Sequence, residues 1–358
     1  MLRSLALRLL GRMTETGSCL VCGSAGPEVL FTATDHLVSG EDFVLKRCNV
    51  CGFTFTADPP DEKDIAKFYL SEDYISHSDK KQNITDRVYH LARNYMLRKK
   101  FKLVSKISGR EKDALVDIGS HREDSKLADI KSGGEKGTLV DIESGRGTSK
   151  LVDIGSGRGK GTLVDIGSGT GYFADYMTRK GWNVTGIELS EPAREYSITR
   201  FGLTVISPTE ISAIKDGSVD CVTLWHVLEH LYEPVKWLKE IMRILKDDGT
   251  CIIALPNIKS ADAGWFGNEW AALDVPRHLW HFSPATLQAF IKQHGFNCTE
   301  LKPMPLDIYY IATLSYKNKG YRLPLLRGTA TGLFLAARSL FKKDRASSLI
   351  YVISKQLD

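Results

Sequence analysis

The sequence contains no run of about 18 consecutive apolar residues, so we expect no helix that spans a membrane. Blocks of Lys and Arg are short, and a net charge of +5 is small for 358 residues, so no nucleic-acid partner is expected. Residues 1–13 alternate leucine with arginine and lack a small-residue cleavage site, unlike a secretory signal. We expect a cytoplasmic protein in which residues 1–13 form an extension open to peripheral membrane contact, with Met1 or Met13 as the natural start.

Cysteine is sparse, but four of the seven cysteines stand in a regular pattern. Cys19 and Cys22 form one C-x-x-C-G motif, Cys48 and Cys51 form a second, and 25 residues separate the two pairs. A thiolate pair at this spacing fits one edge of a tetrahedral Zn²⁺ site, and two pairs close it. Without a secretion signal, zinc is favoured over disulfides, which remain the alternative. We predict a zinc-binding module at residues 14–58, with a structural ion held by Cys19, Cys22, Cys48 and Cys51.

Residues 163–190, LVDIGSGTGYFADYMTRKGWNVTGIELS, combine a short apolar strand, a glycine-rich turn, a helix and a second strand. Gly167, Gly169 and Gly171 follow the first strand, so the backbone of the turn can approach a ligand closely. Glu188 ends the second strand, where a carboxylate can accept hydrogen bonds from both hydroxyls of a ribose. Open α/β sheets bind ligands at this edge, so the unit predicts a site for an adenosine-type cofactor.

The glycine spacing distinguishes between cofactors. The pattern is D-x-G-x-G-x-G from Asp165, with Tyr172 where the dinucleotide motif G-x-G-x-x-G has its third glycine. Together with DGSVDCVTLWHVLEHL and EIMRILKDDGTCIIALPN downstream, this pattern resembles the class I S-adenosylmethionine-dependent methyltransferases of small molecules. A nicotinamide-binding domain or an empty structural turn is the alternative. The resemblance implies S-adenosyl-L-methionine as the cofactor, with binding residues Asp165, Gly167, Gly169, Gly171, Glu188, Glu210, Trp225 and His226.

The segments around these motifs predict an α/β, doubly wound fold. The resemblance implies a seven-stranded, mostly parallel sheet of the Rossmann-like methyltransferase type, with the small zinc module and helical additions. Further strands are expected at residues 203–206, 219–224, 250–255, 296–301 and 347–354. The resemblance implies that the last of these, the closing strand, is antiparallel. Helices are expected at residues 61–69, 86–107 and 192–201, from Pro234, and from Pro284 to His294.

A tandem repeat precedes the cofactor motif. Leucine recurs every 12 residues from Leu103 to Leu163, and each copy provides a four-residue strand and a turn rich in Gly, Ser and Lys. The copy at 151–162 also spells D-x-G-x-G-x-G from Asp153, but another strand follows it instead of a helix. We therefore assign the site to the last copy, and expect the earlier copies to form a loop or extra strands at a sheet edge. The predicted organisation is an extension (1–13), a zinc module (14–58), a helical connector (59–112), the repeats (113–162), and a methyltransferase domain (163–358) with a helical insertion (307–345).

Methyl transfer from a sulfonium requires the enzyme to position two reactants and to remove a proton. The candidate bases at the carboxyl ends of the fourth and fifth strands are Glu229, His230, His278 and His281. For each histidine, a hydrogen-bonded structural role is the alternative. His278 and His281 lie in an aromatic-rich loop, residues 258–284, expected to be a lid or substrate wall. Tyr69 and Tyr74 of the connector are further candidates for contact with substrate or cofactor, with helix packing as the alternative.

The absence of two motifs narrows the range of possible methyl acceptors. The sequence Asn/Asp-Pro-Pro-Tyr/Phe, which nucleic-acid amino-methyltransferases carry after the fourth strand, is replaced by Leu-Trp-His, and no Pro-Cys nucleophile occurs. We therefore expect a small-molecule methyl acceptor, such as a sugar, quinone or lipid-like compound, methylated at oxygen or carbon. The alternatives are an rRNA base methyltransferase with a zinc ribbon and a non-catalytic S-adenosylmethionine-binding or scaffold protein. The sequence does not determine the oligomeric state.

Overall fold

The computed structural model describes residues 18–69, 84–109, 161–339 and 342–356. Tyr74 and the repeat copies up to residue 160 lie outside these ranges. Two sheets organise the described chain: a seven-stranded sheet in the order β10-β11-β8-β7-β4-β5-β6 and a four-stranded sheet in the order β1-β2-β3-β9. The bounds of the strands are β1 Glu28–Thr34, β2 Asp42–Arg47, β3 Thr54–Thr56, β4 Thr162–Ile166, β5 Asn183–Ile187, β6 Thr204–Ile206, β7 Val219–Trp225, β8 Leu245–Pro256, β9 Trp280–His281, β10 Phe296–Pro303 and β11 Ser348–Lys355.

The large sheet is doubly wound and mostly parallel, as predicted. Strands β8, β7, β4, β5 and β6 pair in parallel, while β11 is antiparallel to both β8 and β10. The β8 strand begins at Leu245, five residues before the strand expected at 250–255, because Val219 pairs with Leu245 across a register shift. The closing strand is antiparallel, as expected.

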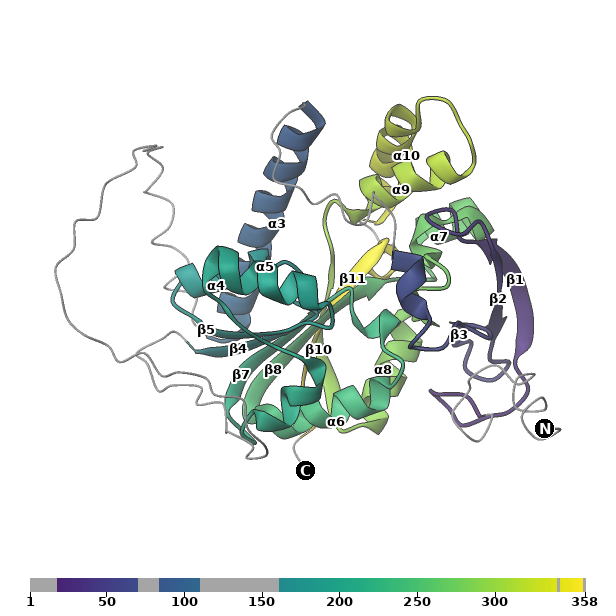
Figure 1. Cartoon of the computed structure of the whole chain (residues 1–358). Coiled ribbons are helices and arrows are strands. Elements are labelled where there is room, and N and C mark those ends of the chain that lie inside the picture. Colours follow the sequence, from purple (N-terminus) through teal and green to yellow (C-terminus); the bar gives the residue numbers. More distant parts are fainter. Residues whose placement is uncertain (1–17, 70–83, 110–160, 340–341, 357–358) are drawn as a thin grey trace, which may run out of the picture.

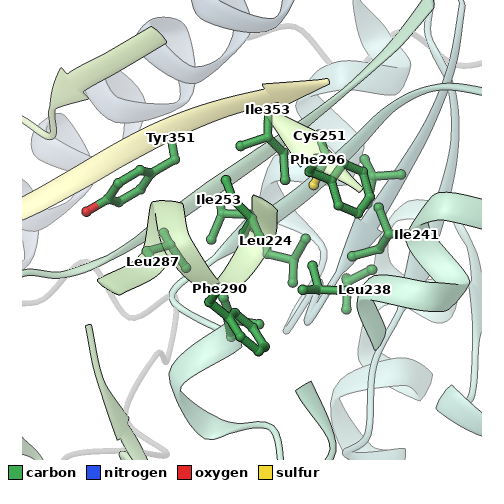
Figure 2. Close-up of a cluster of buried hydrophobic side chains, with 14 of the residues drawn as sticks. Leu224, Leu238, Ile241, Cys251, Ile253, Leu287, Phe290, Phe296, Tyr351 and Ile353 are labelled. Atoms are coloured by element: carbon green, nitrogen blue, oxygen red, sulfur yellow. The ribbon is translucent and has the colours of Figure 1, made fainter. Parts of the chain in front are cut away.

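Helices cover both faces of the large sheet (Figure 1). On one face, α3 and α4 pack Phe101 and Met177 against strand residues such as Leu163. On the other face, α6 and α8 bury Leu238 and Phe290 against β7, β8 and β11, and Figure 2 shows this cluster. The bounds of the α-helices are α3 Ile84–Ile107, α4 Tyr172–Arg179, α5 Glu191–Phe201, α6 Pro234–Ile244, α7 Ala261–Phe266, α8 Pro284–Gln293, α9 Asp307–Asn318 and α10 Pro324–Ser339. The 3₁₀ helices are η1 Ile65–Tyr69, η4 Pro208–Ala213, η5 Leu228–His230, η6 Gly267–Glu269, η7 Ala271–Leu273 and η8 Lys343–Arg345.

The small sheet joins the cysteine-rich region to the rest of the chain. Its first two strands, β1 and β2, lie between the two cysteine pairs. Its fourth strand, β9, comes from residues 258–284: Thr54 pairs with His281 and Phe55 pairs with Trp280. That segment is not the single loop expected from sequence, because it folds as α7, η6, η7 and β9.

The aromatic side chains of residues 258–284 serve mainly as core. Trp270 is 2% exposed and donates its indole N–H to Asp262 at 2.8 Å, and Phe282 is fully buried beside Phe53. Trp265 is the exception, at 53% exposed. The number of aromatic residues in this segment therefore follows largely from the interface between the two sheets.

Candidate active site at the carboxyl edge of the large sheet

The glycine turn connects β4 to α4, and its three glycines have different reasons to lack a side chain. A Cβ at Gly167 would lie 2.4 Å from Cγ2 of Val227, and one at Gly171 would lie 2.8 Å from Cδ1 of Leu203. At Gly169 the space is open to 4 Å, but φ is +55°, a conformation that favours glycine. The outer glycines are thus required by close packing, whereas the middle one leaves room for a ligand.

The Glu188 carboxylate lies beside that open space. Its Oε2 accepts a hydrogen bond from the backbone N–H of Gly169 at 2.8 Å, and Oε1 accepts one from Ser190 at 2.8 Å. The next side chain, Leu189, is apolar and 72% exposed. A carboxylate anchored at the strand end next to an exposed aliphatic surface suits a ligand that combines hydroxyls with a flat ring.

A buried aspartate and a lysine lie on the other side of the turn. Asp165 accepts a hydrogen bond from the Thr223 hydroxyl at 2.6 Å, and burial raises the pKa of Asp165 to about 7. The ammonium of Lys100, from α3, lies 4.3 Å from the centroid of the Trp225 ring. Burial lowers the pKa of Lys100 to about 8, against the attraction of Asp165 and Asp307. The site therefore holds a weakly solvated cation on an aromatic face.

His226 follows directly after β7 in a strained backbone conformation, with φ at +57°. Its Nε2 lies 3.2 Å from Oδ2 of Asp307, and its Nδ1 lies 3.4 Å from Oε1 of Glu229. Burial opposes protonation of the ring, but the two carboxylates outweigh it and raise the pKa of His226 to about 10. With 32% of its side chain exposed, His226 is an imidazolium that reaches solvent between two fixed anions.

The four candidate bases, Glu229, His230, His278 and His281, form one cluster. One ligand atom each of Glu229, His230 and His278 lies within 4.8 Å of the others. The ring centroids of His230 and His278 are 4.6 Å apart, and that of His281 is 6.5 Å from His278. The fold thus unites residues that are about 50 positions apart, because β9 and η5 lie next to each other.

Backbone carbonyls fix the proton positions of two of these rings. His230 Nδ1 lies 3.1 Å from the carbonyl oxygen of Arg277, and His278 Nδ1 lies 2.9 Å from that of Ala272. A carbonyl oxygen only accepts, so Nδ1 carries a hydrogen in both rings. Two such imidazoles and the carboxylate of Glu229 could hold a divalent metal ion, or could receive a proton.

The third ring is fixed by a hydroxyl. Thr56 donates to the carbonyl oxygen of His278 at 2.7 Å, so the same hydroxyl accepts from His281 Nε2 at 3.0 Å. Burial lowers the pKa of His230 to about 4 and that of His281 to about 3. Burial raises the pKa of Glu229, but His226 and the nearby histidines lower it further, so the carboxylate is ionised.

Tyr69 and Glu210 occupy different surroundings. The Tyr69 hydroxyl lies 3.2 Å from His230 Nδ1, at the edge of the cluster. Glu210 accepts a hydrogen bond from the backbone N–H of Ser207 at 2.8 Å and completes a capping box at the start of η4. Its expected place near an adenine ring stays a prediction.

The four motif cysteines form a separate group. Sγ of Cys19 lies 3.6 Å from Cys51, Sγ of Cys22 lies 3.6 Å from Cys48, and all four lie within 4.8 Å of one another. Zn–S bonds of about 2.3 Å in a tetrahedron imply sulfur separations of about 3.8 Å, so the group fits a zinc ion. Burial raises the pKa of Cys48, but the backbone of Cys51 and the Ser24 hydroxyl lower it further, to about 6, which favours the thiolate.

A family model described as a methyltransferase domain matches residues 93–301, more than half of the chain. The chain belongs to this family. The class I fold expected from the glycine and Asp-Gly motifs is thereby confirmed, together with its seven-stranded sheet.

Several curated proteins resemble this methyltransferase over part of their length. The ubiquinone biosynthesis O-methyltransferase of Xanthomonas euvesicatoria is 27% identical over 147 residues, which cover 37% of this chain and 62% of the relative. A probable S-adenosylmethionine-dependent methyltransferase of Mycobacterium tuberculosis is 26% identical over 89 residues, 24% of this chain and 32% of the relative. The chain thus spans less than two thirds of the length of these relatives. Among solved structures, a methyltransferase from Archaeoglobus fulgidus matches with a TM-score of 0.38 and 16% identity, over 54% of this chain and 85% of that one.

The site of this methyltransferase also contains residues that the sequence did not suggest. Lys100 reaches the site from α3, Asp307 reaches it from α9, and Val227 covers Gly167. Lys100 and Asp307 lie far from every motif, and neither has a sequence pattern of its own. Val227 lies inside the Leu-Trp-His-Val-Leu-Glu-His run, which marks the region but not the contact.

Proposed function

We propose that this protein transfers the methyl group of S-adenosyl-L-methionine to a small-molecule acceptor. The observation that carries the proposal is the contact between Glu188 and Gly169. It places a carboxylate and an open glycine at the carboxyl edge of the sheet, where the neighbouring Gly167 packs against Val227, two residues before Glu229. The names of the relatives support an oxygen acceptor, since those from Xanthomonas and Cupriavidus are O-methyltransferases of ubiquinone biosynthesis.

The cofactor would be held by residues of three strands. Glu188 would exchange its bond to Gly169 for the ribose hydroxyls, and Leu189 would contact the adenine. Trp225 and His226, at the end of β7, would line the methionine end. S-adenosylmethionine supplies an activated methyl group, so the protein's own task is to orient the acceptor and receive its proton.

Within the cluster, we assign proton acceptance to Glu229. Its carboxylate is ionised and 1% exposed; Oε1 faces Nδ1 of His226 at 3.4 Å, and Oε2 receives no hydrogen bond from the described residues. His226, already protonated and fixed by Asp307, is a poor base and instead serves to position Glu229. The rings of His230, His278 and His281 would then form the wall that orients the acceptor.

We assign the cysteine group a structural zinc ion. Cys19, Cys22, Cys48 and Cys51 would fill all four positions of a tetrahedral site, so no position remains for substrate. The ion would fix the loops that carry β1, β2 and β3, and through β9 it would steady His281.

The test separates this function from its alternatives. The purified protein is titrated with S-adenosylmethionine in a calorimeter, and is then incubated with methyl-labelled cofactor and either a small-molecule extract or total RNA. We expect cofactor binding and label in an organic-soluble product. Label in RNA would support the rRNA alternative, cofactor binding without any transfer would support a binding protein, and absence of cofactor binding would contradict the proposal itself.

The residue assignments require matched variants. Glu229→Gln removes the proton acceptor without changing its shape, so we expect loss of transfer with cofactor affinity retained. Glu233→Gln alters a 64% exposed carboxylate on the next helix and serves as the control. Equal transfer rates in the two variants would remove Glu229 from the mechanism.

A further inference from the structure

The α10 helix is packed in an unusual orientation for a surface helix. Its buried positions are Gly328, Gly332 and Leu335. A Cβ at Gly328 would lie 2.3 Å from Oγ1 of Thr313, and one at Gly332 would lie 2.7 Å from the Tyr309 ring, so α9 and α10 touch along the glycines. Surface helices normally bury their large apolar residues. In α10, the two glycines make the contact with α9.

The large apolar side chains of α10 face outward as a result. On the helix, Leu326, Leu333 and Phe334 lie on the side opposite the two glycines. They are 67%, 58% and 51% exposed. The patch continues beyond the helix, because Trp265 of α7 lies 6.3 Å from the Phe334 ring. Leu323, Leu325, Tyr310 and Tyr321 of the α9–α10 hairpin are also exposed. Exposed apolar side chains gathered on one helix face mark an interaction site.

Beyond Asp307, the charged residues of the hairpin that carries most of this patch have one sign. Between Asp307 and Asp344 the sequence contains no acidic residue. Seven basic residues fall in the same interval: Lys317, Lys319, Arg322, Arg327, Arg338, Lys342 and Lys343. Arg338 lies 5.7 Å from the Phe334 ring and Arg327 lies 4.9 Å from the Tyr321 ring, so cations flank the apolar face directly.

We propose that the α9–α10 hairpin docks onto the surface of an anionic lipid bilayer. Exposed leucine and aromatic side chains enter the boundary between headgroups and acyl chains, while the flanking arginines meet lipid phosphates. An apolar face bordered by cations alone complements such a surface. Among the described residues, none of the helices has the length and hydropathy needed to traverse a bilayer. The hairpin therefore lies on the membrane surface.

The hairpin also begins at the candidate active site, since Asp307 is the first residue of α9 and contacts His226. In Figure 1 the two helices stand apart from the large sheet, next to α7. Docking through α10 would thus bring the site close to the membrane. Lipid binding itself does not depend on the proposed methyl transfer, and its test measures lipid binding alone.

The test is flotation of the full-length protein with vesicles. We expect it to float with vesicles of phosphatidylglycerol mixed with phosphatidylcholine, and much less with phosphatidylcholine alone. Leu326→Ser combined with Phe334→Ser removes apolar anchors that are 67% and 51% exposed, and should weaken binding at least tenfold. Arg327→Gln with Arg338→Gln should weaken it by roughly fivefold per charge and reduce its salt dependence.

Matched controls use exposed residues elsewhere. Val29→Ser with Val50→Ser removes two apolar side chains that are 64% and 73% exposed on the cysteine-rich region, and should leave flotation unchanged. Equal binding to both vesicle types, or a Leu326→Ser/Phe334→Ser variant that floats like the parent protein, would overturn the proposal. A third outcome would also overturn it: the parent protein does not float, sedimentation shows a dimer, and Phe334→Ser abolishes that dimer.

Discussion

The guanidinium of Arg277 lies 2.8 Å from the carboxylate of Asp35, and both side chains are almost completely buried. Asp35 follows β1, and Arg277 precedes β9, so the pair joins the two ends of the small sheet from positions 242 residues apart. Arg277 also donates to Asp274 at 2.7 Å and to the carbonyl oxygen of Phe68 at 2.8 Å. These contacts hold the segment that carries His278 and His281.

Breaking this pair should be costly. Arg277→Met leaves the Asp35 carboxylate buried without its ion-pair partner. Asp35→Asn leaves one N–H group of Arg277 without its charged acceptor. Loss of one member of a buried pair typically costs about 3–5 kcal/mol, so urea unfolding should show a decrease of that size for Arg277→Met. Arg47→Met, which breaks the largely exposed pair with Glu28, should cost less than about 1 kcal/mol. Equal losses in the two variants would contradict the role of Arg277.

Removal of Glu188 should weaken cofactor binding. Glu188→Ala deletes the carboxylate expected to receive the ribose hydroxyls, and charged hydrogen bonds of this kind are worth about 1–3 kcal/mol. Calorimetry should therefore show S-adenosylmethionine affinity reduced by about fivefold to more than 100-fold. Glu191→Ala, in the exposed first turn of α5, is the control and should bind normally. An unchanged affinity in Glu188→Ala would place the nucleotide elsewhere.

The ion pair of His226 predicts how stability depends on pH. Its pKa is raised from 6.5 to about 10 in the folded protein, so the native state binds a proton that the unfolded chain releases. This contribution is fully present below pH 6.5 and is lost as the pH rises through about 10. The His226→Asn variant, which tolerates positive φ, should lose less stability over that interval than the parent protein. Parallel melting curves from pH 6.5 to 10 would contradict the assignment.

The cysteine group should bind one zinc ion per chain. Cys48→Ser removes one of four ligands, and elemental analysis should find the ion lost, while S-adenosylmethionine binding weakens only modestly because the glycine turn lies in the other sheet. Cys298→Ser, which alters a cysteine outside the group, should retain zinc. Zinc well below one per chain in protein purified without chelators would contradict the prediction.

The repeats allow a test of which copy forms the site. Deletion of Leu115 to Thr162 joins Ala114 to Leu163, and the cofactor site should persist because a long insertion contributes little beyond loop-closure entropy. In the full chain, Asp165→Ala should abolish cofactor binding, since Asp165 lies in β4 beneath the turn. Asp153→Ala should have no effect. The reverse pattern would mean that another copy occupies the sheet.

The sequence predicts the large sheet well because its signals are local. Most strands of that sheet contain a short apolar run, and the Asp165 and Glu188 motifs mark the edge where the cofactor is expected. The strands from 296 and 347 follow the same reasoning, whereas the antiparallel closure is implied by the family resemblance. The β8 strand differs, because pairing with Val219 makes it begin before the expected strand at 250–255.

The contacts that complete the site are not local. A two-residue strand such as Trp280–His281 has no periodicity, so its pairing with Phe55 and Thr54 could not be expected. Lys100 and Asp307 lie on helices whose positions are set by packing alone, and a lone charged residue on a helix normally indicates a solvated surface. Sequence therefore identified Glu229 and the histidines as candidates, but not the charges that fix their protonation.

The pairing of β3 with β9 sets an order of events during synthesis. The N-terminal strands leave the ribosome long before Trp280 and His281 exist, and at about 5–20 residues per second the interval between Thr54 and His281 lasts about 10–45 s. During that time Phe53, which ends almost fully buried, lacks the Trp280 and Phe282 rings that later cover it, and Phe55 lacks its strand partner Trp280. The nascent chain thus exposes the unpaired edge of β3 and four reduced thiols at the same time. Early metal binding by the cysteines and chaperone binding at this edge should therefore govern the yield of folded protein.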